Sequence, residues 1–453
     1  MKKLLLLMLL PAVAFAQSHQ LTKADKIYGL SKFWQEVNYN FVYLNKIDRN
    51  KWDSTYKALI ISIPETKTDY EYYHEMQRFC ATLKDGHTNV NMPAGKDFEP
   101  LTTMFGNYRL FIENVEDKAI ITRVNFSKKD EIPVGSEVIE VNGIPTAKYI
   151  AEYVAPYISS STDYGLKDWS RSNLLQGLEG SQFEIKIKKP KGQILSLKLT
   201  HQHTEEKEVF PAFSSSLLDF KWYPNNVAYI ALNSFVEAKI DSLFISKLPE
   251  LYKAKGIIVD LRKNGGGDTW VGSYILKYLT NDSLLYGARY STRQLNSAFK
   301  AWGKYTSTKD TVNSEWNKKA LLTYQDNYFY DFDYHPLKND LSAKRIVVPT
   351  VLLIGHHTAS AAEDFLIYAD NQKHMTKIGR NSCGSTGQPY WFDLPGGGSA
   401  RVCTKKDTYP DGREFVGYGI KPDIEIIPTV KDFIANKDAT LNTAVNYLNK
   451  KIK

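Results

Sequence analysis

The sequence is poor in several features that define large classes of proteins. It has only three cysteines in 453 residues, and no cluster of His, Cys and acidic residues has the spacing of a metal site. Its net charge of +8 is modest and spread along the chain, which gives no case for nucleic-acid binding. No run is apolar over the roughly 20 residues that a membrane-spanning helix needs. We therefore expect neither a metal nor an organic cofactor, no nucleic-acid partner and no membrane span.

The one apolar run at the start of the chain is short and has the layout of a secretory signal peptide. Lys2 and Lys3 precede the apolar segment Leu4 to Leu10, and small residues in Ala12 to Ala16 fit a cleavage site. We expect residues 1–16 to be removed and the protein to be periplasmic or extracellular.

An oxidising compartment permits disulfides, and an odd number of cysteines leaves at least one unpaired. Cys383 and Cys403 flank a predicted hairpin, and the sequence leaves open whether they form a bridge. Cys80 lies on the apolar face of a predicted helix, which is typical of a small buried residue.

The periodicity of apolar residues changes along the chain and predicts a multidomain protein of mixed helix and sheet, with an α/β catalytic part. We expect an N-terminal helical domain over residues 17–95 and a strand-rich domain over 96–203 with a helical insertion. Residues 204–435 alternate strands and helices, with strands expected at 227–232, 256–261 and 346–354, and are interrupted by a polar, Tyr- and Trp-rich insertion at 283–345. A last helix is predicted over 436–453.

One segment of the strand-rich part resembles a known signature. Val134 to Gly143 is similar to the G-D-x-I-x-x-V-N-G pattern of PDZ domains, which bind peptide C-termini by adding a strand to a sheet edge. The alternative is an ordinary small β domain.

Two polar segments follow predicted buried strands, where open α/β sheets place their ligands. Asp260 to Gly267 ends in three glycines, whose N–H groups could hold an oxyanion, although a plain tight turn gives the same pattern. Ser360 is predicted at a helix N-terminus, where the helix dipole favours a developing negative charge. The alternative is a capping box between Ser360 and Glu363, in which the serine only caps the helix.

Four motifs in the same order resemble those of the tail-specific, or C-terminal processing, serine proteases of peptidase family S41. They are Asp85 to Thr88, Asp260 to Gly267, Thr358 to Glu363 and Gly417 to Asp423. The resemblance implies a peptidase with Ser360 as the nucleophile and with the N–H groups of Gly266 and Ala361 as the oxyanion hole.

One departure from the family pattern concerns the base. Many members use a Ser–Lys dyad, but Ser385 stands at the position of the lysine, and a neutral hydroxyl cannot take a proton at pH 7. The tricorn-like branch uses an upstream histidine, which His87 matches, with a carboxylate near the closing motif. We expect His87 to be the general base and Glu414 to orient it; a turn histidine and a surface salt bridge are the alternatives.

These observations predict an exported serine peptidase that cleaves peptides or protein C-terminal tails through an acyl-enzyme at Ser360. Because the lysine is missing, a non-catalytic binding protein is the alternative, with the aromatic insertion at 283–345 lining a pocket for a hydrophobic ligand. Tricorn-like relatives assemble, so a homo-oligomer is compatible with the resemblance.

Overall fold

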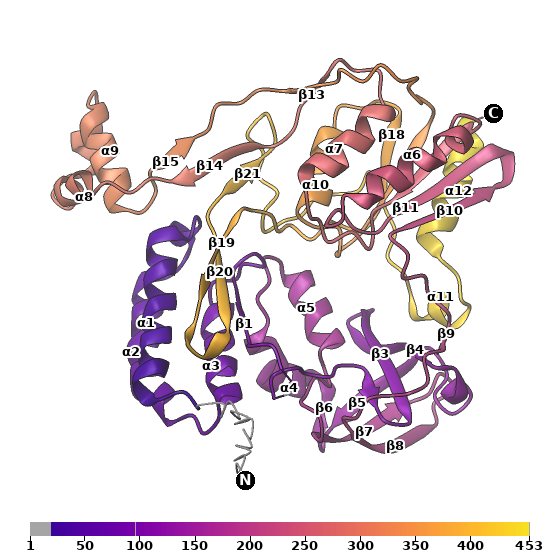
Figure 1. Ribbon diagram of the computed structural model, residues 1–453, viewed down its shortest axis with the longest axis horizontal. Coiled ribbons are helices and arrows are strands. Elements are labelled where there is room, and N and C mark those ends of the chain that lie inside the picture. The colour runs from indigo at the N-terminus through magenta and orange to yellow at the C-terminus, as the bar shows by residue number, and fades with distance from the viewer. Residues whose placement is uncertain (1–19, 96, 453) are drawn as a thin grey trace, which may run out of the picture.

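The protein mixes helices and sheets as expected, which confirms the fold class (Figure 1). The computed structural model describes residues 20–95 and 97–452. The predicted signal peptide lies outside these ranges. Among the described residues, no helix has both the length and the apolar character that crossing a bilayer requires.

A six-stranded sheet forms the centre of the C-terminal part. In spatial order its strands are β10 (Leu218–Tyr223), β11 (Val227–Leu232), β12 (Gly256–Asp260), β17 (Thr350–Ile354), β18 (Met375–Gly379) and β22 (Ile424–Glu425). All neighbouring pairs are parallel except β10 with β11. The predicted strand at 346–354 begins four residues later than expected, because Pro349 has no N–H to donate to a ladder.

Helices cover both faces of this sheet, because successive side chains of a strand point to opposite faces. Ile258, Val351 and Leu353 pack against one helix, α12 (Ala439–Lys451), whereas Ile257 and Leu352 belong to the core on the other face. That other face is covered by α6 (Lys239–Leu251), α7 (Thr269–Tyr278) and α10 (Ala361–Tyr368). Burial on both faces explains why β12 and β17 are continuous apolar runs.

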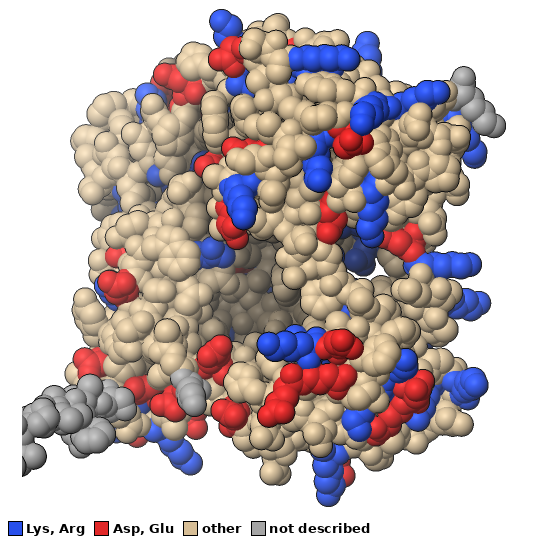
Figure 2. Space-filling view, turned by 45° about the vertical axis from the view of Figure 1, so that its right-hand side comes forward, with Lys and Arg blue, Asp and Glu red and all other residues tan. Residues whose placement is uncertain are grey.

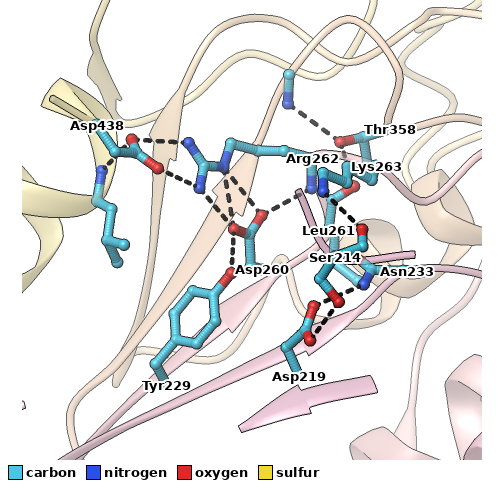
Figure 3. Close-up of polar contacts among 12 residues, drawn as sticks. Ser214, Asp219, Tyr229, Asn233, Asp260, Leu261, Arg262, Lys263, Thr358 and Asp438 are labelled. Atoms are coloured by element: carbon cyan, nitrogen blue, oxygen red, sulfur yellow. Dashed lines mark hydrogen bonds and ion pairs between the residues drawn. The ribbon is translucent and has the colours of Figure 1, made fainter. Parts of the chain in front are cut away.

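An ion-pair network fastens the end of β12 to α12 (Figure 3). The Arg262 guanidinium bonds to both carboxylate oxygens of Asp260 and to both of Asp438, and the Tyr229 hydroxyl donates to Asp260 at 2.9 Å. Asp438 is also the N-cap of α12, where its side chain accepts from the Leu441 N–H. The chain that leaves β12 toward the glycine run is therefore held in place by the C-terminal helix.

A second, antiparallel sheet has its own hydrophobic core. Its main strands are β3 (Tyr108–Val115), β4 (Lys118–Asn125), β5 (Ser136–Val141), β7 (Gln182–Lys188) and β8 (Ile194–Thr200). The connection between β5 and β7 contains α5 (Asp163–Ser172), which packs on β3. This connection extends toward the six-stranded sheet and contributes to the site described below.

Three N-terminal helices, α1 (Lys23–Asn40), α2 (Arg49–Ser62) and α3 (Asp69–Ala81), begin at side-chain N-caps. Their buried face is not a separate core: the hydrophobic cluster runs without a break from these helices into the C-terminal part. Phe33, for example, contacts Phe392 with a ring separation of 6.4 Å. After α3, β1 (Asn89–Asn91) pairs with β20 (Ser399–Cys403), which pairs in turn with β19 (Pro389–Asp393).

The insertion at 283–345 forms an arm that extends from the body (Figure 1). Its outer end is a pair of helices, α8 (Ser297–Gly303) and α9 (Glu315–Tyr324), whose aromatic rings Phe299, Trp302 and Trp316 pack on one another. The three cysteines are all free, so Cys383 and Cys403 form no bridge in this structure, and Cys80 is buried as expected.

Candidate active site

The nucleophile turn follows β17 and is bonded directly to the loop that follows β12. Thr358 donates its hydroxyl to the Leu261 carbonyl oxygen at 2.9 Å, a contact drawn in Figure 3, and the Ala359 N–H donates to the Asn264 carbonyl oxygen at 3.0 Å. Ser360 sits at the N-terminus of α10 with φ 55° and ψ −124°, a backbone conformation that non-glycine residues rarely adopt. Such strain persists only where the surrounding structure imposes it, and it is commonly found at functional sites.

Glu363 holds this strained turn in place through hydrogen bonds to both of its carboxylate oxygens. One carboxylate oxygen accepts from the N–H groups of Ser360 (3.1 Å) and Ser385 (3.2 Å), and the other accepts from Ser382 Oγ (2.5 Å) and the Gly384 N–H (2.7 Å). Burial raises the pKa of Glu363 to about 8, and these four hydrogen bonds oppose the shift. The bond to Ser360 resembles half of a capping box, but Glu363 also fixes the loop that carries Ser385.

The structure brings His87 to Ser360 although 273 residues separate them in sequence. His87 Nε2 lies 3.3 Å from Ser360 Oγ, and its Nδ1 lies 2.7 Å from Ser385 Oγ. Burial, together with the positive charges of Arg401 and Lys405, lowers the pKa of His87 to about 4. The imidazole is therefore neutral at pH 7 and can accept a proton.

A chain of hydroxyl groups continues from the far side of the imidazole. Ser385 Oγ lies 3.1 Å from Ser161 Oγ, which lies 3.3 Å from Asp85 Oδ1 and also accepts from the Gly86 N–H at 2.9 Å. The buried Asp85 accepts a further hydrogen bond from the Thr88 hydroxyl at 2.6 Å. Burial raises the pKa of Asp85, and the hydrogen bonds from Thr88, His87 and Ser161 oppose that shift.

The expected orienting carboxylate, Glu414, is not at the site. Its side chain pairs with Lys406 and with Lys46, and the hydrogen bond from Lys406 lowers its pKa. The position on His87 that a carboxylate would occupy is taken by Ser385. The expectation for Glu414 was therefore wrong: the surface salt bridge is what forms.

The oxyanion-hole expectation needs a correction at one of its two residues. The Gly266 N–H donates to the Asn264 side chain at 2.9 Å and is not free for a substrate. The Ala361 N–H makes no hydrogen bond to the described part of the chain and lies beside Ser360. A β-carbon on Gly266 would come within 2.6 Å of Ser360 Cβ, so glycine is needed there for close approach.

These residues line a cleft of about 1250 Å³. It is bordered by α3, by the connection that carries Ser161, by the glycine loop and by β19 and β20. Figure 2 shows the surface hollowed between the upper and lower parts of the molecule. No described residue of the 283–345 arm lines this cleft, so the arm does not form the apolar pocket that a carrier of hydrophobic ligands would need there.

His356 and His357 line the same cleft, but their contacts are with another element and not with Ser360. His356 Nδ1 is 2.6 Å from Asp168 Oδ2, and His357 contacts Trp169 edge to face. Both partners belong to α5. These histidines therefore connect the nucleophile turn to the connection that supplies Ser161.

The chain is similar to known proteins in two comparisons. Residues 226–426 match the family model described as peptidase family S41. Among solved structures, mature CPAF complexed with lactacystin is similar with a TM-score of 0.61 and 13% identity, covering 95% of this chain and 98% of that one. A peptidase from Parabacteroides merdae has a TM-score of 0.50 and 16% identity, with 94% and 97% covered. No curated protein matches the sequence. At these identities the solved structures show a shared fold.

Proposed function

We propose that this chain, whose residues 226–426 match the model of peptidase family S41, is a serine peptidase in which Ser360 is the nucleophile and His87 the general base. Membership of the family implies a peptide or protein as the substrate. One observation carries the proposal: a single neutral imidazole contacts Ser360 Oγ with one nitrogen and a fixed hydroxyl with the other.

In the proposed reaction, Ser360 Oγ attacks the carbonyl carbon of a peptide bond while His87 Nε2 takes the hydroxyl proton. The tetrahedral intermediate then collapses, the C–N bond breaks, and the leaving amine receives the proton from Nε2. Water then attacks the ester carbon while Nε2 takes its proton, and the C–O bond to Ser360 breaks as Nε2 returns the proton to Oγ. The 3.3 Å separation of Nε2 and Oγ fits a pair that tightens when a substrate binds.

The hydroxyl chain takes the role that we had expected of a carboxylate. With a proton on His87 Nδ1, this nitrogen donates to Ser385 Oγ, which can also accept from Ser161 Oγ. The single hydroxyl proton of Ser161 can alternatively be donated to Asp85 Oδ1. This arrangement fixes the tautomer that leaves Nε2 free. It also places a buried negative charge at the end of the chain when the imidazolium forms.

The developing oxyanion would be held by the Ala361 N–H, aided by the dipole of α10. We propose the Gly267 N–H as the second donor, in place of Gly266. Gly267 lines the cleft next to Ser360, and its N–H bonds to no acceptor among the described residues.

We also propose an extracytoplasmic location, based on the predicted signal peptide, and a peptide-binding role for the sheet of β3 to β8, based on the PDZ-like segment. The connection between β5 and β7 carries Ser161, so this sheet is linked physically to the hydroxyl chain.

A fluorophosphonate probe tests the nucleophile directly, because it reacts only with an activated serine. We expect the wild-type protein to be labelled, Ser360→Ala to remain unlabelled, and His87→Ala to lose peptidase activity by at least about 10²-fold. Labelling that survives Ser360→Ala would remove Ser360 from the mechanism. Co-purified lipid without peptidase or esterase activity would instead favour the carrier.

A further inference from the structure

A second, smaller cavity of about 510 Å³ opens from the active-site cleft at the nucleophile. Ser360, Gly267 and Gln388 line both spaces, whereas Thr269, Asp364 and Lys405 line only the smaller one. A substrate whose scissile carbonyl lies at Ser360 would therefore have a neighbouring side chain at the mouth of this cavity.

Asp364 is the unusual group in the cavity. It is only 4% exposed, and its Oδ2 accepts a hydrogen bond from the Thr269 hydroxyl at 2.5 Å. Its Oδ1 has no hydrogen-bond partner among the described residues. An acceptor that is buried without a partner is unfavourable, so this oxygen can gain a hydrogen bond when a ligand enters.

The charges around Asp364 do not balance. Lys405 Nζ is already paired with Asp407 Oδ1 at 2.9 Å and lies 4.1 Å from the centre of the Tyr290 ring. Two buried carboxylates thus share one ammonium group, which leaves one negative charge when both are ionised. Burial raises the pKa of Asp364, and it raises that of Asp407 to about 7, as expected for carboxylates that are not fully compensated.

Lys405 is the only positive charge among the described residues that acts on Asp364. Tyr290 from β14 (Arg289–Arg293) and Tyr368 from α10 face Asp364, and burial raises the pKa of both phenols, so they stay neutral. Asp268, at the start of α7, adds a further exposed carboxylate at the mouth. The cavity therefore offers an acceptor and an excess of negative charge.

We propose that this cavity is a specificity pocket for a basic side chain, Lys or Arg, of the residue that supplies the scissile carbonyl, with Asp364 as its recognition group. The inference depends on the proposed peptidase function. A basic group would give Asp364 Oδ1 a donor and would balance the remaining charge. An apolar side chain would leave Asp364 Oδ1 without a donor and the negative charge without compensation. An acidic side chain would be repelled by that negative charge.

Matched fluorogenic peptides test this assignment. They differ only at the residue before the cleaved bond, which is Lys, Arg, Gln, Met or Glu. For the wild-type enzyme we expect kcat/KM for Lys and Arg to exceed that for Met and Glu by at least about tenfold. For the basic substrates kcat/KM should also rise as the pH increases through about 7, because the Asp407 carboxylate, whose pKa burial raises to about 7, then becomes ionised and adds to the negative charge of the cavity.

Asp364→Asn should abolish the preference for Lys and Arg. Lys405→Met should increase it, because the basic side chain of the substrate then meets two carboxylates and no competing ammonium group. The exposed carboxylate of Asp130 serves as a control, and Asp130→Asn should leave all ratios unchanged. Fluorophosphonate labelling of every variant reports the nucleophile separately from the pocket. Normal labelling together with a preference for apolar or acidic residues would overturn the pocket but leave the peptidase proposal standing. An unchanged ratio of kcat/KM for basic to apolar substrates in a labelled Asp364→Asn or Lys405→Met variant would also overturn the pocket.

Discussion

At the scale of the residue, the proposed mechanism requires one tautomer of His87, the one that leaves Nε2 free to take the proton of Ser360. Nε2 can take a proton only if the single ring proton of the neutral imidazole is on Nδ1. The partner of Nδ1 is the Ser385 hydroxyl, and a hydroxyl by itself can act either as donor or as acceptor. Ser161 Oγ lies within hydrogen-bond distance of both Ser385 Oγ and Asp85 Oδ1, and an ionised Asp85 can only accept. In the proposed mechanism this buried carboxylate, two hydroxyls away from the imidazole, stabilises the imidazolium when it forms.

This argument predicts a difference between two adjacent serines. Ser161→Ala breaks the chain, so kcat should fall by roughly tenfold with KM unchanged, because the imidazolium loses its stabilising charge. Ser160, whose hydroxyl donates to the Thr162 carbonyl oxygen, lies outside the chain, and Ser160→Ala should stay within about twofold of wild type. Steady-state kinetics of both variants on one peptide make the comparison.

The pH profile separates positioning from simple structural damage. The proposed mechanism requires a neutral His87, so for peptides without a basic residue before the cleaved bond kcat/KM should be lost only as the pH falls through about 4. Without Ser161 the imidazolium is less stable, and the acid limb should move to still lower pH. An unchanged limb, or equal losses in Ser160→Ala and Ser161→Ala, would contradict a role for the chain.

At the scale of the element, the site depends on two tight turns pressed against each other at the ends of β12 and β17. Gly266 has φ +98°, and the space where its β-carbon would lie is filled by Ser360 and by the Ala359 carbonyl oxygen. Ser360 has a positive φ as well. Each turn can adopt its conformation only because the other holds it there.

We therefore expect Gly266→Ala to reduce kcat by roughly 10²-fold or more, because it displaces the nucleophile and the adjacent oxyanion donor. Gly265 is the matched control: its backbone has no positive φ, and a β-carbon there meets no atom within 4 Å. Gly265→Ala should retain most of its activity. Equal activities of the two variants, measured with correctly folded protein, would argue against this account of the turns.

Sequence patterns predicted the elements better than they predicted the contacts between elements. The strand Val227–Leu232 was predicted at its observed bounds, and the buried strand at 256–261 was predicted to within one residue, since apolar periodicity is a local signal. The approach of His87 to Ser360 followed from a family resemblance. The role of Ser161 could not be predicted, because its neighbours Asp85 and Ser385 lie 76 and 224 residues away.

The same limitation explains the two incorrect expectations. Glu414 was chosen for its position near a motif, but Lys46 and Lys406 lie closer to it in the fold. Gly266 was chosen from the glycine run, but the Asn264 side chain of the same run bonds to its N–H. The sequence does contain a carboxylate close to His87, because Asp85 belongs to the same Asp-Gly-His-Thr element.

At the scale of the whole molecule, the parts of the chain share one hydrophobic core and are joined by a few strong polar contacts. Arg262 is the clearest of these, because it connects β12 to the N-cap of α12 through Asp260 and Asp438. Removing the guanidinium would leave the Asp260 carboxylate, which is 8% exposed, without a positive partner.

Arg262→Met should therefore lower the free energy of unfolding by roughly 2–4 kcal/mol. The surface pair of Lys253 and Glu250 provides the control. Lys253→Met should change the free energy of unfolding by less than about 0.5 kcal/mol. Urea denaturation followed by circular dichroism measures both variants. If the two variants have the same midpoint, Arg262 does not fasten the C-terminal helix.

The pairing of β1 with β20 has a consequence for the biosynthesis of the enzyme. Residues 89–91, which follow His87 directly, gain their strand partner only when residues 399–401 have left the ribosome. For most of translation the nascent chain contains His87 but not yet its partners Ser360 and Ser385. If the chain is the proposed peptidase, its reactive groups meet only near the end of synthesis, and it cannot cleave the proteins around it before then.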